Sequence, residues 1–132
     1  DDALTVLSRA FEAAPAFGNA RLYYAVGAIY AGKFALADEL LIELPTERIH
    51  EERIVKAYFD VKQYGKVLEI WKARAASNPG NVQFKISLAA AYLLNGERQK
   101  SIRILEEALA LQPESKKEIE FYISEIRAGR NP

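Results

Sequence analysis

The sequence has 132 residues, half of them apolar and 27% charged, which is ordinary for one globular domain. Eighteen basic residues balance eighteen acidic ones, so the positive footprint typical of nucleic-acid binders and of helices held on anionic lipid is missing. The absence of cysteine excludes disulfides, thiolate nucleophiles and Cys-ligated metals, and the single histidine, His50, excludes a His–His metal site.

Prolines divide the chain at regular intervals. Pro15, Pro45, Pro79 and Pro113 are spaced by 30, 34 and 34 residues, and each follows an apolar, helix-forming run. A proline just past a helix is a stop signal, because it cannot continue the hydrogen-bonded ladder. The sequence therefore predicts four equivalent helices, over 3–15, 35–45, 67–79 and 101–113. The second of them has lost about one turn.

A second set of helical stretches lies between these runs, over 19–34, 46–64 and 81–98. We expect N-caps at Asn19, Thr46 and Asn81, and helix ends at Gly32 and Gly96. A last helix is expected to start at a capping box, Ser115-x-x-Glu118, and to end near Gly129. No strand pattern competes, so the chain is predicted to be all-α with about eight helices.

A 34-residue helix–turn–helix unit of this kind resembles the tetratricopeptide (TPR) repeat. The best match carries the family's large, small and aromatic residues, its turn glycine and its second-helix pattern at Leu88, Ala89, Tyr92, Gly96, Ser101, Leu105, Ala108 and Pro113. The preceding unit departs from the family at Val55 and Arg74, where small residues are expected. The resemblance implies a right-handed α-solenoid of stacked antiparallel helix hairpins.

The resemblance also implies a single TPR-like domain over 1–132. Its parts are a half repeat (1–15), repeat 1 (16–45), repeat 2 (46–79), repeat 3 (80–113) and a capping helix (114–129). In repeat 1 an ungapped register places Tyr24, Ala25 and Ala28 on the core face. A competing register would use Val26, Gly27 and Tyr30 but needs a two-residue deletion, so we prefer the ungapped one.

Each candidate catalytic, metal or cofactor site is explained more simply by an ordinary surface residue or by an incomplete motif. His50 lies in HEER, which lacks the second ligand of the zinc-protease HExxH motif. Adjacent acidic pairs such as Glu106 and Glu107 diverge on a helix and cannot share a site. The glycines form no phosphate loop, and the short basic clusters are typical of a solvated surface. We therefore predict no enzyme, no cofactor and no nucleic-acid partner.

The segment Arg21–Tyr30 has more apolar residues than the core of one hairpin can bury, because the expected helix is apolar on nearly every face. In TPR stacks the first helices of the hairpins line a concave groove. Carrying the ungapped register over, we expect that groove to bind a protein or peptide through Leu22, Tyr23, Val26, Tyr30, Arg53, Lys56, Phe59, Gln83, Ile86 and Ala90. An amphipathic helix or extended peptide with an acidic residue facing Arg53 and Lys56 would suit this surface.

The leading hypothesis is a non-catalytic protein–protein interaction scaffold. The alternative is a self-associating structural or assembly domain, for example of a bacterial envelope protein, whose homodimer buries Leu22, Val26 and Tyr30. The paired lysines and asparagines of the chaperone-tail clamp are absent from the matching positions, so that ligand is not expected. The lack of methionine, even at position 1, predicts a segment of a longer protein. No signal peptide or membrane-spanning run is visible, so we expect no direct membrane insertion, and localisation stays open.

Overall fold

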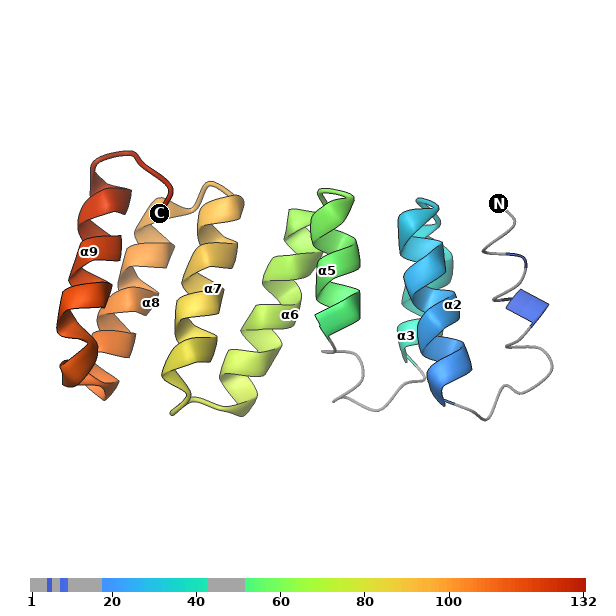
Figure 1. Ribbon diagram of the computed structural model, residues 1–132, viewed down its shortest axis with the longest axis horizontal. Helices are drawn as coiled ribbons and strands as arrows, with labels where there is room; N and C mark the ends of the chain where they lie inside the picture. Colours follow the sequence, from blue (N-terminus) through green and yellow to red (C-terminus); the bar gives the residue numbers. More distant parts are fainter. Residues whose placement is uncertain (1–4, 6–7, 10–17, 43–51) are drawn as a thin grey trace. The chain divides into compact units, whose positions relative to one another are not determined.

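The computed structural model describes residues 5, 8–9, 18–42 and 52–132, and over these ranges it contains helices and turns but no strand. The chain divides into two compact units, residues 1–63 (unit 1) and 64–132 (unit 2). Figure 1 shows their helices. Except for residues 5, 8 and 9, the predicted half repeat lies outside the described residues, as do the second-helix end at Pro45, Thr46 and His50.

Unit 1 contains α2 (Gly18–Tyr30), α3 (Phe34–Ile42) and α5 (Glu52–Asp60). Helix α2 packs against both α3 and α5. Alanines occupy buried positions at Ala25 and Ala28 of α2 and at Ala37 of α3, so the helix backbones can approach closely. The burial of Ala25 and Ala28 fits the ungapped register, whereas Tyr30, a core residue in the competing register, is exposed.

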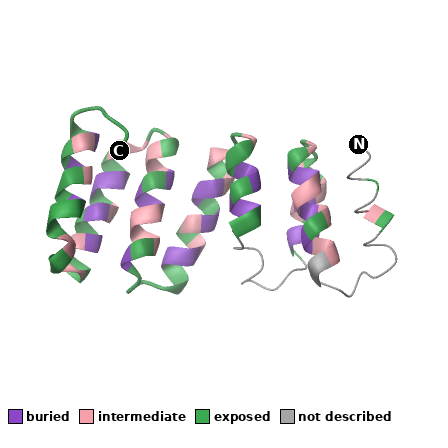
Figure 2. Ribbon diagram, in the orientation of Figure 1, coloured by how far each residue is buried: buried purple, intermediate pink, exposed green. Residues whose placement is uncertain are grey.

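Unit 2 contains α6 (Tyr64–Ser77), α7 (Val82–Leu94), α8 (Arg98–Leu111), the short 3-10 helix η1 (Pro113–Ser115) and α9 (Lys116–Arg127). Each α-helix packs against the next along the chain. Figure 2 shows their buried residues in purple. The core of α7, α8 and α9 is formed by Val82, Ala89, Ile102, Leu105, Ala108, Ile119, Ile123 and Ile126. Within it, the Ser101 hydroxyl donates a 2.8 Å hydrogen bond to the Ala89 carbonyl, which satisfies a buried polar group where α7 and α8 meet.

The helix ends repeat one turn geometry. Gly32, Lys62, Gly96 and Gly129 follow helices α2, α5, α7 and α9, and all four have positive φ. At each turn, the amide of the next residue donates to a carbonyl five residues back, as in Lys33 to Ala28 at 2.8 Å. Glycine takes this left-handed conformation without strain. The predicted helix ends at Gly32, Gly96 and Gly129 are confirmed, and Lys62 adopts the same turn without being glycine.

The predicted caps have mixed outcomes. Asn81 is the N-cap of α7, with its side-chain oxygen accepting from the Phe84 amide at 3.0 Å. Helix α2 begins at Gly18, so Asn19 lies inside the helix and the predicted cap there is wrong. At the last helix, Ser115 is the N-cap residue as predicted, but the hydrogen bond of the capping box is wrong. The Ser115 hydroxyl accepts from the side chain of Gln112 at 2.6 Å and makes no cap hydrogen bond, because the chain first turns through η1.

Candidate functional site

The expected contact residues of repeats 1 and 2 meet on the surface of unit 1, where α2 and α5 lie together. Arg53 of α5 reaches Tyr23 of α2 in two ways. Its guanidinium donates to the Tyr23 hydroxyl at 3.2 Å, and its central carbon lies 5.2 Å from the centroid of the Tyr23 ring. A guanidinium at that distance from an aromatic ring makes a cation–π contact, so Arg53 holds the Tyr23 ring in one orientation.

A second cross-helix contact joins Tyr30 to Asp60. The Tyr30 hydroxyl donates to the Asp60 carboxylate at 2.7 Å, and the Lys56 ammonium contacts the same carboxylate oxygen at 2.7 Å. The hydrogen bonds from Lys56 and Tyr30 lower the pKa of Asp60 below 3.8. The bond to Asp60 raises the pKa of Tyr30 above 10.0 and that of Lys56 above 10.5. The carboxylate is therefore ionised, and both donors are protonated, at neutral pH.

Three aromatic side chains stand out from this face despite these contacts. Tyr23 is 41% exposed, Tyr30 49% and Phe59 47%. Val26 is half-buried between the two tyrosine positions on α2. We name Tyr23, Val26, Tyr30, Arg53, Lys56 and Phe59 the α2–α5 face. It combines apolar rings with charged groups that are already paired inside the unit.

Leu22 requires a correction. It was expected to face a partner, but its side chain has no exposed surface. Leu22 precedes the core position Ala25 by three residues and Ile29 by seven, so it falls on the buried stripe of α2. The apolar excess of this helix therefore divides into a wide core stripe and a smaller exposed set. Leu22 is part of the core.

The expected contact residues of repeat 3 lie on α7 in unit 2. Gln83 and Ala90 are exposed, and Ile86 is half-buried. Ile86 and Ala90 line a pocket of about 180 Å³ together with residues of α8, of α9 and of the segment after α9. The remaining lining residues are Ala89, Leu93, Ser101, Leu105, Tyr122, Ile126 and Pro132. Apart from two hydroxyl-bearing side chains, the lining is aliphatic.

Sequence reasoning missed the contribution of α9. That helix was predicted only as a capping helix, yet its Tyr122 and Ile126 line the pocket. The signal was present, because Ile119, Tyr122, Ile123 and Ile126 form an apolar stripe at helical spacing. An apolar stripe of this width can pack against the core on one side and line the pocket on the other.

The described residues contain no cluster of three or more His, Cys, Asp or Glu side chains that could hold a metal ion. Among them, no helix combines the length and apolar character needed to cross a bilayer.

Trp71 of α6 is half-buried and packs edge-on against Phe84 with ring centroids 5.8 Å apart. The buried Arg74 lies over its ring at 4.5 Å, in the place where the TPR pattern has alanine.

Comparison with known proteins identifies the fold. MamA AMB-1, a TPR-containing protein, is similar in structure, with a TM-score of 0.57 at 20% sequence identity; the match covers 97% of this chain and 73% of that one. No protein-family model matches the sequence, and no curated protein matches it. The fold is thus an all-α, TPR-like helical repeat, as predicted.

Proposed function

We propose that this chain is a non-catalytic protein-interaction module that binds a peptide or a partner helix through its first-helix faces. The observation that carries the proposal is the α2–α5 face, where three aromatic rings remain two-fifths to one-half exposed. Aromatic side chains are enriched at the energetically dominant positions of protein interfaces. The TPR-like fold supports the same proposal, because stacked hairpins provide an extended surface on which a partner can lie.

The contacts within the α2–α5 face refine the expected partner chemistry. Lys56 already contacts Asp60, and Arg53 already contacts Tyr23. A partner carboxylate would therefore compete with these contacts rather than meet uncommitted cations. We infer that apolar and aromatic side chains of the partner supply most of the binding energy, and that Arg53 contributes orientation.

The test uses peptides selected from a phage-displayed random library against the intact chain. Phe59→Ala should weaken a selected peptide by about tenfold, because truncating an interface aromatic costs on the order of 1–2 kcal/mol. The matched control is Phe121→Ala on α9, since Phe121 is 55% exposed and does not line the pocket. Tyr30→Phe keeps the aromatic ring but removes its hydrogen bond to Asp60, so it separates the contribution of the ring to binding from that of the hydrogen bond.

Equal effects of Phe59→Ala and Phe121→Ala would contradict the proposal. The same variants address self-association as the competing function. If sedimentation velocity shows a dimer that Phe59→Ala dissociates, the α2–α5 face serves assembly, and the peptide proposal fails.

A further inference from the structure

One asparagine of this chain, Asn95, precedes a glycine, in the turn between α7 and α8. The backbone nitrogen of the residue after an asparagine can attack the asparagine side chain, and glycine hinders this attack least because it has no side chain. The other four asparagines precede alanine, valine or proline. Asparagine is a thermolabile residue, and Asn95–Gly96 is therefore the place where spontaneous deamidation of this sequence is expected first.

The structure gives the Asn95 side chain a role in holding two helices together. Its amide nitrogen Nδ2 donates to the Ala91 carbonyl of α7 at 2.8 Å and to the Tyr64 carbonyl, at the start of α6, at 3.0 Å. The amide group thus donates twice, and the second bond crosses to a helix against which α7 packs. Asn95 ties the end of α7 to the start of α6 within unit 2.

The same turn keeps the two reacting groups apart. The Gly96 amide donates to the Leu93 carbonyl at 3.0 Å, so its proton is engaged. Asn95 has ψ 9°, whereas ring closure needs a rotation that eclipses the Gly96 nitrogen with the Asn95 Cβ. Gly96 is exposed, and a Cβ built on it would meet nothing within 4 Å, so solvent reaches the turn freely. Backbone conformation, rather than access, therefore limits the reaction.

We propose that Asn95 is a deamidation site that the turn after α7 keeps closed, and that deamidation separates the end of α7 from α6. In the opened turn, hydroxide takes the Gly96 amide proton, and the nitrogen forms a bond to Cγ of Asn95. The Cγ–Nδ2 bond breaks, and the amino group leaves as ammonia with a proton from water. Water then opens the succinimide ring to an aspartate or isoaspartate. Overall, one amide and one water give one carboxylate and one ammonium ion.

The product cannot restore the contact that Asn95 makes. A carboxylate at this position has no hydrogen to donate, and it faces the carbonyl oxygens of Ala91 and Tyr64, which now repel it. It also places a negative charge at the C-terminal end of α7, where the helix dipole disfavours an anion. The change is therefore one-way: unit 2 permanently loses a contact between α6 and α7. This consequence goes beyond the proposed binding function and is independent of it.

The first test follows deamidation of the intact chain in mildly alkaline buffer, with and without unfolding by guanidinium chloride. Proteolytic digestion and mass spectrometry locate the converted asparagines. Asn95 should convert at least about tenfold more slowly in the folded chain, because the hydrogen bonds of the turn must open first. Asn78 is a matched internal control: its side chain also donates to a carbonyl four residues back, that of Arg74 at 3.1 Å. Because Pro79 has no N–H to attack, Asn78 should stay unmodified in both conditions.

The second test measures the consequence with the product residue. Asn95→Asp should raise the equilibrium constant of unfolding about tenfold, since it loses both hydrogen bonds and adds repulsion. The control Asn81→Asp adds the same charge at the other end of α7. The Asn81 side chain accepts from the Phe84 amide, so a carboxylate keeps that cap, and stability should not fall. Guanidinium denaturation of both variants gives the comparison.

Three results would overturn the proposal. They are conversion of Asn95 as fast in the folded chain as in guanidinium chloride, conversion of another asparagine before it, or an Asn95→Asp variant as stable as the wild type. Neither test uses a binding partner, so its outcome is distinguishable from failure of the α2–α5 face.

Discussion

The α2–α5 face of unit 1 and the α7–α9 pocket of unit 2 are built from corresponding helices of the predicted repeats, yet their chemistry differs. In unit 1, the two helices are joined across their exposed side by Arg53 with Tyr23 and by Tyr30 with Asp60. In unit 2, the space between α7 and α9 is an aliphatic pocket. Exposed polar pairs contribute little stability but fix orientation. An apolar pocket contributes binding energy when an apolar side chain fills it and excludes water.

One architecture thus offers two kinds of contact. The α2–α5 face presents rings that are already oriented, and the pocket offers a volume that a side chain can enter. The four predictions that follow alter one side of this comparison at a time.

The largest effect is expected from the floor of the pocket. Leu105 of α8 is 2% exposed, and Leu105→Ala should lower the free energy of unfolding by about 3 kcal/mol through lost burial and a new cavity. Leu111 lies on the same helix but is 50% exposed, so Leu111→Ala should cost less than about 0.5 kcal/mol. Urea denaturation of both variants measures the difference. Equal losses would show that the core of unit 2 is not where the structure places it.

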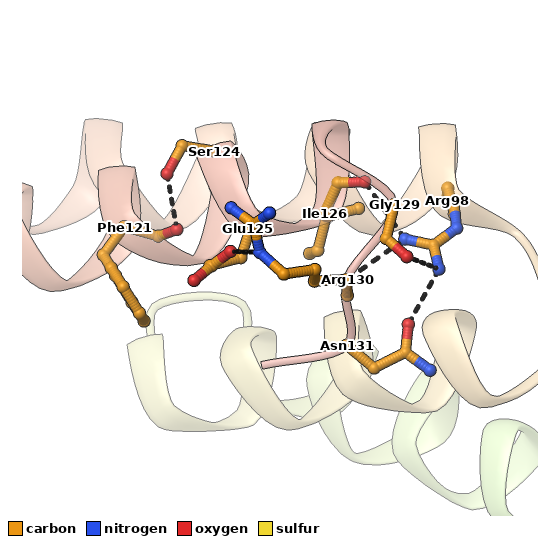
Figure 3. Close-up of polar contacts among 8 residues, drawn as sticks. All are labelled: Arg98, Phe121, Ser124, Glu125, Ile126, Gly129, Arg130 and Asn131. Atoms are coloured by element: carbon orange, nitrogen blue, oxygen red, sulfur yellow. Dashed lines mark hydrogen bonds and ion pairs between the residues drawn. The ribbon is translucent and has the colours of Figure 1, made fainter.

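The next effect concerns the hydrogen bonds of Arg98 to the chain at and beyond the end of α9 (Figure 3). Arg98→Ala removes four hydrogen bonds, one to Ile126 of α9 and three to residues 129–131, and should cost about 1–2 kcal/mol, because the arginine is only partly buried. Arg103→Ala, an exposed site on the same helix, is the control. Hydrogen exchange at the last turn of α9 should accelerate only in the Arg98 variant. Unchanged protection there would show that Arg98 does not hold the end of α9 and the residues after it.

Two substitutions in the left-handed turns should change the stability of the protein in opposite directions. Lys62 has φ +62°, and Lys62→Gly should stabilise the protein by about 1 kcal/mol, since a left-handed backbone strains residues with a Cβ. At Gly32, with φ +76°, an added Cβ would meet nothing within 4 Å, so Gly32→Ala tests backbone strain alone. It should destabilise by a similar amount, about 1 kcal/mol. Thermal unfolding compares the two, and shifts of the same sign would contradict the shared turn geometry.

The smallest effect is a pH dependence of the α2–α5 face. The lowered pKa of Asp60 means that its contribution to stability is present above its unfolded pKa, near 3.8, and is lost as pH falls through the folded value. The stability difference between the wild type and Asp60→Asn should therefore be small at pH 7 and vanish on acidification below about pH 4. At the alkaline end, the raised pKa of Tyr30 predicts a contribution that is kept below pH 10 and lost above it. Denaturation at several pH values, with Tyr30→Phe alongside, measures both limits.

The sequence predicts a structural feature well where local interactions determine it, and less well where residues farther along the chain do. Gly32, Gly96 and Gly129 mark helix ends because their turns need positive φ, which is a local property. Lys62 was not found, because neighbouring residues select its turn although its own side chain disfavours it. The start of the last helix at Ser115 was predicted correctly, but the capping-box hydrogen bond was not, since a 3-10 turn over Pro113–Ser115 precedes the helix and the Ser115 hydroxyl accepts from Gln112.

The candidate site was less predictable than the fold. The register of repeat 1 correctly placed Tyr23 and Tyr30 at the surface, but a helix that is apolar all round does not reveal the width of its core stripe. Leu22 was assigned to the wrong side for that reason. Pro132 and Ile86 line the same pocket because the chain reverses after α9, and no spacing in the sequence predicts that reversal.

The most direct test of the central claim is the set of amide chemical-shift changes caused by a peptide selected against the intact chain. The account predicts that the largest changes fall on the first helices of the hairpins, α2, α5 and α7, with the aromatic positions of the α2–α5 face among them. Changes concentrated in α3, α6 and α8 would contradict it, because the partner would then lie on the second helices of the hairpins.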